Sequence, residues 1–431
     1  MDDRCLHPLA RARRARGLSQ QQLAARVRDS AARRGLRSGT DASRIRKWER
    51  GIRPDADSQS YIAQALGLSA DIIDGPWPDW LPLTDTGVVP LATHATVPAL
   101  REALRTVDRR TFLTVSSAAL TTLTADWAAA DTPKAVSAQL AGDGDLADVL
   151  ELTARQLAAA DPVHHPHTTR LLREHLATVT DLLDRGSYGP ATRYRLHTLA
   201  ADIAHTLAWR RFDNGDNAQA AQYWIAALHN SHAVHDTDRG AGLISDLAYQ
   251  AAWQSDHALA GQLLIHALSR ATHPAARSLL QLRLARTHAA RRETRPALRA
   301  LAAAEKHLDQ TAGDRPTWCA WLSDADLAVD SGQTLLDLGD SARAHQLITD
   351  GERLLPAHRG KTRGIFLAYQ AASHLDLKEP EPAATAAIQS LLLARRIHAP
   401  RCISLVEDLI PRFQPYRQTP GVTDLLHLTA A

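Results

Sequence analysis

Cysteine is scarce in this sequence, which contains three, Cys5, Cys319 and Cys402, far apart and odd in number. Their positions match neither a disulfide framework nor a zinc-binding pattern. No apolar run approaches the ~18 residues that a membrane-spanning helix needs, and the N-terminus has no apolar signal region. These absences predict a cytoplasmic protein in a reducing environment, without a membrane segment.

Motifs of catalysis are lacking as well. The chain has no P-loop, no glycine-rich dinucleotide turn, no G-x-S-x-G elbow and no H-E-x-x-H. Histidine is plentiful, with 21 residues, and it clusters at 164–167 and 229–235. Neither cluster has a cysteine or carboxylate at the usual ligand spacing, so we expect no metal site. The sequence therefore predicts a protein that is not an enzyme and holds no cofactor.

Charge is distributed unevenly along the chain. The formal net charge is +3, yet residues 1–54 alone carry +10 and the remaining residues carry −7. A basic head on an acidic body indicates that any binding to a polyanion is confined to the N-terminus.

The most informative basic stretch covers residues 40–52. Wound as a helix, it places five residues that can pack on one side: Asp41, Ile45, Trp48, Glu49 and Ile52. The opposite side gathers four cations and a hydroxyl: Ser43, Arg44, Arg46, Lys47 and Arg50. Such a helix can enter a DNA major groove with its basic side. Taken alone, it could also be a solvated basic helix on an ordinary helical domain.

Four landmarks accompany this helix in order. Gly17 follows a helix predicted over residues 7–16, and LSQQQLA at 18–24 places Ser19 and Gln22 as a capping box. WERG ends the basic helix, and IAQALGL at 62–68 belongs to the closing helix of the domain. Over about seventy residues the chain thus resembles the Xre or phage-repressor helix-turn-helix family.

This resemblance implies specific roles. Gln20 would bond a phosphate, and Arg13 with Glu49 would form a structural ion pair. The base-contacting positions of the family are occupied by Ala42, Ser43, Arg46 and Lys47, and its backbone-contacting positions by Arg44 and Arg53.

The chain departs from the family between its second and third helices. Residues 28–39 replace the usual short turn. We expect the second helix to reach Arg34 and to break at Gly35, and we expect Arg33 and Arg37 to add phosphate contacts.

The sequence divides into four segments. Residues 1–74 form the predicted DNA-binding domain, and residues 75–96, rich in Pro and Trp, form a linker that cannot be helical at 76–82. Residues 97–189 are helical, either as degenerate repeats or as a dimerisation segment. Residues 190–431 form a predicted repeat domain. The expected fold is all-α, because strand signals are absent from residue 97 onward.

A pattern of alanine, an apolar residue four positions later and a small or apolar residue three beyond that recurs five times in the repeat domain. The successive anchors are Ala220, Ala260, Ala297, Ala344 and Ala384. Twelve positions before each anchor stands another small residue: Ala208, Ala248, Ala285, Gly332 and Ala372. This pattern resembles the tetratricopeptide repeat, in which small residues let paired helices approach closely. The anchors lie 40, 37, 47 and 40 residues apart, so these are longer, degenerate repeats.

An α-solenoid of such hairpins has a concave face that usually binds something. The inward positions of the family correspond here to a mixture of polar and aromatic residues: Asp202, His205, Trp209, Ser245, Tyr249, Arg286, Asp326, Gln333, Tyr369 and Ser373. They suit an extended peptide or a small amphipathic molecule. Alternatively, they only cover the inside of a scaffold or contact the chain's own linker.

Together, head and repeats resemble bacterial regulators that sense signalling peptides in quorum sensing, and regulators of secondary metabolism. The resemblance implies a homodimeric transcription regulator, by default a repressor, on a palindromic stretch of double-stranded DNA. Ligand or protein binding on the repeats would change the relation of the two heads. The alternative is an interaction scaffold with a constitutive protein partner and little DNA specificity.

Overall fold

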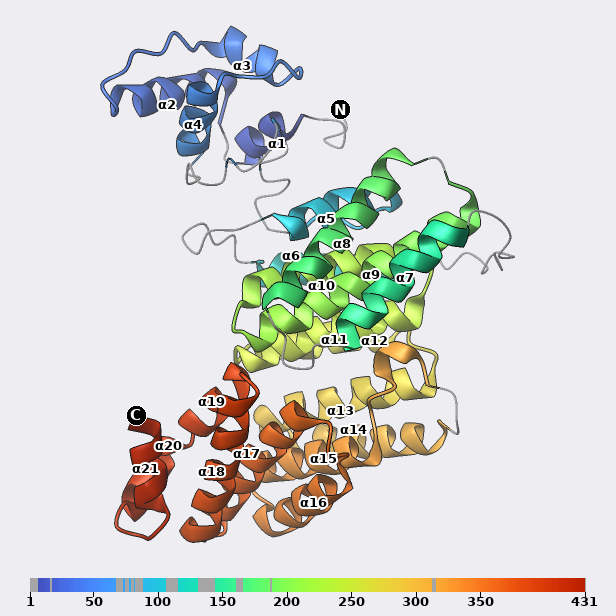
Figure 1. Ribbon diagram of the computed structural model, residues 1–431, viewed down its shortest axis with the longest axis vertical. Helices are drawn as coiled ribbons and strands as arrows, with labels where there is room; N and C mark the ends of the chain where they lie inside the picture. Colours follow the sequence, from blue (N-terminus) through green and yellow to red (C-terminus); the bar gives the residue numbers. More distant parts are fainter. Residues whose placement is uncertain are drawn as a thin grey trace.

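The computed structural model describes residues 7–15, 18–66, 73, 77–78, 81, 88–105, 115–130, 144–159, 166–186, 188–311 and 315–430. Within these ranges every regular element is helical, and the helices pair into a solenoid of tetratricopeptide-like hairpins (Figure 1). The predicted all-α class and repeat architecture are thus confirmed. No described helix is long and apolar enough to cross a membrane.

Four short helices form the N-terminal head: α1 (Pro8–Ala15), α2 (Gln20–Ala32), α3 (Ala42–Trp48) and α4 (Ala56–Ala65). They enclose a small apolar core to which each helix contributes, for example through Leu9, Leu23, Ile45 and Ile62. The Ser19 and Gln22 capping box begins α2 as predicted.

Two details of the head differ from the sequence-based expectation. The second helix ends at Ala32, and residues 33–35 form a turn in which Gly35 has φ +72°. The third helix ends at Trp48, and Gly51 follows with φ +95°. Ile52 therefore leaves the helix and is 55% exposed, so its expected packing is wrong. The expectation treats residues 40–52 as one helix, whereas Gly51 takes a left-handed conformation after the helix has ended.

The linker is shared between two cores. Trp77 and Leu81 are buried in the core of the head, whereas Val88 and Val89 are buried in the core of the body. Arg105, after α5, donates to the carbonyl oxygen of Leu81 over 2.7 Å. Trp80, another tryptophan of the linker, lies outside the described residues.

Four helices precede the repeats: α5 (Thr96–Leu104), after a 3-10 turn at Thr93–Ala95, then α6 (Ser117–Ala129), α7 (Gly144–Ala159) and α8 (Pro166–Arg185). All four pack on the repeats. α5 contacts α8 and α10, α6 contacts α12, and α7 and α8 contact each other and α9. A Cβ on Gly240 would lie 2.7 Å from the Trp127 indole, so α6 needs a glycine at this point of α11.

Ten helices then form the five predicted hairpins. The first is α9 (Pro190–Asp213) with α10 (Asn217–Ala233), and the second is α11 (Thr237–Trp253) with α12 (His257–Leu268). The remaining pairs are α13 (Pro274–Ala290) with α14 (Thr294–Asp309), α15 (Asp324–Leu338) with α16 (Ser341–Leu354), and α17 (Gly360–Asp376) with α18 (Pro380–Arg396). A 3-10 turn at Thr317–Cys319 precedes α15.

The small residues of the repeat pattern stand where paired helices touch. Ala208, Ala248 and Ala285 are buried, and so are the five anchor alanines. At Gly332, an added Cβ would lie 2.7 Å from Ile348 Cγ1 and 2.9 Å from the carbonyl oxygen of Ala344. The close approach of α15 and α16 therefore requires a residue without a side chain.

Most turns within and between the hairpins share one backbone conformation. A residue with positive φ is followed by the N-cap of the next helix, as in Gly215–Asp216, Ser255–Asp256 and Gly339–Asp340. The N-cap aspartate accepts a hydrogen bond from the backbone N–H three residues on, which satisfies a free donor of the helix end. The chain ends with α19 (Pro400–Glu407), α20 (Ile410–Phe413), a 3-10 turn at Gln414–Tyr416 and α21 (Val422–Ala430), which pack on the last hairpin.

Candidate functional site

Two adjoining hollows of about 130 and 420 Å³ lie on the inner side of the repeats. They share six lining residues: Ala252, Trp253, His257, Arg286, Ala290 and Asp337. Tyr249 lines the smaller hollow, while Gln333 and Tyr369 line the larger. We call this combined space the inner groove. It is contributed by α11, α13, α15, α17 and α19 together with the start of α12, so it exists only once several hairpins have stacked.

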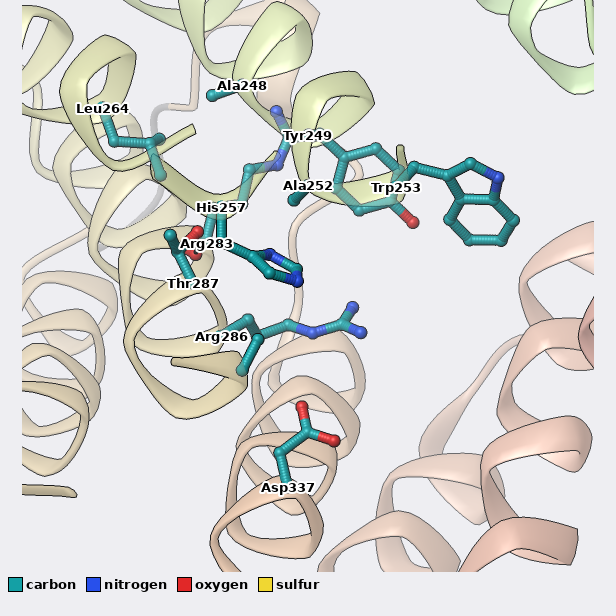
Figure 2. A pocket seen from close by; sticks show the side chains of 11 residues that line it. Ala248, Tyr249, Ala252, Trp253, His257, Leu264, Arg283, Arg286, Thr287 and Asp337 are labelled. Carbon is teal, nitrogen blue, oxygen red and sulfur yellow. Dashed lines mark hydrogen bonds between the residues drawn. The ribbon is translucent and has the colours of Figure 1, made fainter. Parts of the chain in front are cut away.

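Arg286 stands at the centre of the inner groove. In Figure 2 its guanidinium extends between the His257 ring and the Asp337 carboxylate. It donates to Asp330 Oδ1 over 3.0 Å and to the Tyr369 hydroxyl over 3.1 Å. Burial works against its charge, yet the surrounding oxygen atoms raise the pKa of Arg286 well above its usual value. The groove therefore contains a permanent cation.

Burial lowers the pKa of an arginine but raises that of an aspartate, and two aspartates lie near Arg286. Burial raises the pKa of Asp330 and of Asp337 above the ordinary aspartate value, although Arg286 opposes the rise in both. Asp337 accepts from Gln333 Nε2 over 3.0 Å. The lining thus combines hydrogen-bond donors and acceptors without a large excess of either charge.

Two buried polar atoms of the groove lack a hydrogen-bond partner among the described residues. They are Gln333 Oε1 and His257 Nδ1. Such atoms are uncommon in folded proteins, because an unpaired buried polar group destabilises the fold. Both residues line the larger hollow, and a rotation of either side chain would be needed to present the atom to a bound molecule.

A buried ion-pair network lies next to this groove. Arg283 donates to Ser245 Oγ and to Asp246 Oδ1, each over 2.7 Å. His205 Nε2 stands 2.7 Å from the other oxygen of Asp246. Burial opposes ionisation of Asp246, but Arg283 and His205 outweigh it and lower its pKa. Ser245 and His205 are therefore engaged in holding α9, α11 and α13 together.

Four aromatic rings cluster beside the inner groove, and two of them also line it. Trp209 and Phe212 come from α9, and Tyr249 and Trp253 come from α11. Arg401 of α19 reaches into this aromatic cage, and its Nη1 donates to the Tyr249 hydroxyl over 3.3 Å. Arg401 Nε also stands 3.1 Å from Asp213 Oδ1.

The predicted inward residues fall into two groups. Tyr249, Arg286, Gln333 and Tyr369 line the groove, and Trp209 belongs to the cage beside it. The structure places the other five elsewhere. Ser245 and His205 belong to the ion-pair network, Asp202 pairs with Arg239 on the surface, Asp326 holds Ser323 and Arg359, and Ser373 contacts His345. Each of these five is therefore engaged with another residue of the scaffold and does not line the groove.

Several groove residues were not predicted from the sequence. Trp253 and Asp337 each lie four positions after a predicted residue, Tyr249 and Gln333, so extending the helical spacing by one turn would have found them. His257, at the start of α12, has no such signal. Neither does Arg401, which comes from a helix beyond the repeats.

The outer side of the head carries a basic face on α3. Ser43, Arg44, Arg46 and Lys47 are exposed, Ala42 is half-buried, and Ile45 and Trp48 face the core. Arg33, Arg37 and Arg53 are exposed as well, and Arg33 Nη2 bonds Ser30 Oγ. Arg28 of α2 donates to the carbonyl oxygen of Thr40 and so ties the end of the long turn to α2.

Glu49 is the acidic residue that follows α3, and its side chain is shielded from solvent. Arg13 Nε donates to Glu49 Oε1 over 2.6 Å, which agrees with the expected ion pair. Gln20 Nε2 donates to Glu49 Oε2 over 2.6 Å, and Gln20 Oε1 lies 3.4 Å from Arg46 Nε. In this structure Gln20 therefore bridges α2 and α3, whereas the resemblance assigned it a phosphate.

The two described cysteines are buried and free. Burial raises the pKa of Cys319 to about 12 and that of Cys402 to about 11. Both thiols therefore remain protonated near neutral pH and serve as small apolar side chains. Cys5 lies outside the described residues.

The family model of the SP15 N-terminal domain matches residues 9–71, which is the head alone. This family is not the Xre family named from the landmarks, so membership of the Xre family stays a prediction. No curated protein matches the chain. Among solved structures, the crystal structure of the APC/C hetero-tetramer Cut9-Hcn1 is 14% identical, with coverage of 90% of this chain and 80% of that chain. The TM-score is 0.28, too low to carry any inference.

Proposed function

We propose that this protein is an interaction protein whose repeats bind an extended peptide segment in the inner groove. The observation that carries the proposal is the wall of the larger hollow, where Arg286 and Tyr369 stand beside the unpartnered Gln333 Oε1. A peptide backbone offers N–H donors and C=O acceptors in alternation, and this wall contains acceptors and donors for both. The aromatic rings of Tyr249 and Trp253 add apolar area for a side chain.

The experiment is a titration of the full-length protein with peptides selected for binding to it. Gln333→Ala and Arg286→Ala should each weaken the affinity by about tenfold or more, because each leaves a buried polar group of the complex unpaired. Gln346→Ala and Arg299→Ala are matched controls, since both side chains are exposed on second helices of their hairpins. Unchanged affinity in both groove variants would refute the location. A small amphipathic molecule that binds with the same pattern would replace the peptide as the ligand.

A second candidate function concerns the head. We propose that it binds double-stranded DNA and that the protein is a cytoplasmic transcription regulator, by default a repressor that binds a palindromic operator as a homodimer. The specific observation in its favour is charge separation along α3. Arg44, Arg46 and Lys47 face solvent, while Glu49 is held inward by Arg13 and Gln20, so the exposed face is uniformly basic. A groove lined by phosphates attracts such a face.

Selection of genomic DNA fragments by the purified protein separates the two functions. An enriched inverted repeat, with affinity that falls steeply with salt, supports the regulator. If groove peptides release the DNA, the repeats control the head, and the two functions are one mechanism. Weak binding without sequence preference supports the interaction scaffold alone.

A further inference from the structure

The guanidinium of Arg401 is enclosed by four aromatic rings. Its central carbon lies 5.7 Å from the ring centroid of Trp209, 5.1 Å from that of Phe212, 5.8 Å from that of Tyr249 and 5.5 Å from that of Trp253. A single ring at such a distance already attracts a cation through its negative face. Four rings around one guanidinium form a cage with the geometry of a cation-binding site.

Contacts that do not involve α19 hold the four rings of the cage in place. Phe212 packs edge-to-face against Trp209 at 5.7 Å, against Tyr249 at 5.9 Å and against Trp253 at 6.0 Å. Trp209 in turn packs against the fully buried Trp224 of α10, at 5.5 Å. The first two hairpins therefore fix the positions of all four rings, and Arg401 is added from α19 as a guest.

A carboxylate completes the site. Asp213, at the end of α9, stands 3.1 Å from Arg401 Nε, and the two side chains are 11% and 12% exposed. Lys361 Nζ lies 3.5 Å from the other oxygen of Asp213. Burial opposes the charge of Arg401, yet nearby Tyr249 and Asp213 raise its pKa. The rings attract a flat cation, and the carboxylate places a negative charge beside it, so the combination suits a guanidinium.

The cage opens onto the inner groove. Tyr249 and Trp253 belong to both, because the same two rings that contact Arg401 also line the smaller hollow. A peptide lying in the groove can therefore place one side chain at the cage. α19 is itself held by its packing on α17 and α18, so a rotation of the Arg401 side chain would free the cage without unfolding α19.

We propose that the aromatic cage is a binding site for an arginine side chain of the partner peptide, and that Arg401 occupies it in cis as a competing latch. This rests on the proposed function, since the peptide is the groove ligand of that proposal. An intramolecular occupant competes with an effective concentration on the order of millimolar. An arginine side chain alone therefore competes poorly with Arg401. A peptide that makes additional contacts in the groove binds tightly enough to displace it.

The test uses full-length Arg401→Ala and two small probes, N-acetyl-arginine methylamide and its neutral isostere N-acetyl-citrulline methylamide. Calorimetric titration should show the arginine probe binding to the variant about tenfold or more tightly than to the wild type, because the competitor is gone. It should also bind about tenfold more tightly than the citrulline probe, because citrulline has no cation for the rings. Adding Trp253→Ala to the variant should abolish the difference between the probes.

The opposite pattern overturns the proposal. Equal binding of the two probes to Arg401→Ala, or an arginine preference that persists without Trp253, would show that Arg401 only fastens α19 to the first hairpins. Arg401→Gln is the second variant if Arg401→Ala loses its helical content. Should both fail to fold, a saturable tryptophan fluorescence change of the wild type with the arginine probe, absent with citrulline, decides in favour, and its absence decides against.

The cage proposal can fail separately from the proposed function. If the arginine probe shows no preference while Gln333→Ala still weakens binding of groove peptides, the peptide-binding function stands and the cage is structural. If groove variants also leave peptide binding unchanged, both proposals fail.

Discussion

Arg401 Nη1 donates to the hydroxyl of Tyr249 over 3.3 Å, although 152 positions separate the two residues in the chain. Lys361 and Asp213, which are 148 positions apart, meet at 3.5 Å beside them. These contacts join the first two hairpins to helices that follow the fourth hairpin. Residues of α9 and α11 therefore meet residues of α17 and α19, and the inner groove is lined by helices from both of these regions.

The head offers the most direct test of DNA binding. Lys47→Ala should reduce affinity for a selected operator by about 1–3 kcal/mol and relax preference at one base position, because Lys47 is exposed on the basic face of α3. Gln20→Ala should weaken binding to all sequences alike, because Gln20 holds α3 in place through Glu49 and Arg46. Titration of each variant against operator and random DNA gives both values. Operator affinity that survives both changes would exclude α3 as the recognition helix.

The ion pair beneath α3 should stabilise the head. Arg13→Ala should lower its stability by about 3 kcal/mol, because the change leaves the Glu49 carboxylate buried without its cation. Hydrogen exchange of α2 and α3 amides in the full chain measures this loss. The double variant Arg13→Ala with Glu49→Ala should recover part of it, since the unpaired charge is then absent. No recovery would mean that packing of the Arg13 stem, and not charge, stabilises the head.

A buried histidine should make the body sensitive to acid. His229 is fully buried, its Nε2 lies 3.0 Å from the Val89 carbonyl oxygen, and burial lowers its pKa from 6.5 to about 4. In the unfolded chain the imidazole takes up a proton near pH 6.5, whereas in the folded protein it does so only near pH 4. The contribution of His229 to folding stability should therefore fall as the pH drops between these values, by about 3 kcal/mol at most.

The control for this prediction is His229→Gln, whose amide can still donate to Val89 but does not titrate. Denaturant unfolding at pH 7, 6, 5 and 4 should show a shallower loss for this variant than for the wild type. Other buried histidines, such as His197 and His232, whose pKa values burial also lowers, contribute equally to both proteins. Parallel pH profiles would contradict the assignment to His229.

A glycine substitution in one of the turns between helices should stabilise the fold. Ser255 is exposed and has φ +65°, a conformation that glycine adopts without strain and other residues do not. Ser255→Gly should raise stability by about 0.5–1 kcal/mol, which thermal unfolding detects. Gly339→Ala, at φ +93° in the corresponding turn, should lower stability by a similar amount. A loss of stability in Ser255→Gly would show that flexibility of the unfolded chain outweighs relief of strain.

The hairpins were predictable because their determinants are local. Gly332 lies against Ala344 across one turn, and Ala208 and Ala220 are both buried at the same spacing, so a fixed spacing in the sequence is enough to locate such positions. The Ser19 capping box was predictable for the same reason. Ile52 was misplaced because one glycine, Gly51, ends a helix that the apolar spacing seemed to continue.

The groove was only partly predictable, because its position depends on how the hairpins stack. Asp326 and Ser373 occupy family positions that face inward, yet here Asp326 binds Arg359 and Ser373 contacts His345. The repeats are longer than the family length, and each extra residue rotates the following positions around the helix axis. Arg401 has no local signal at all, since its place is set by the summed curvature of several hairpins.

The contact between α19 and the first two hairpins also bears on how such a chain can change in length. In an open solenoid each repeat touches only its neighbours, so repeats can be gained or lost by duplication and deletion. Here, removing the pair α13 and α14 would shorten the arc between Tyr249 and Arg401 and carry the guanidinium away from its rings. The contact of Arg401 with the first two hairpins therefore constrains the number of hairpins between them, and we expect insertions to be tolerated best in turns that point away from the groove.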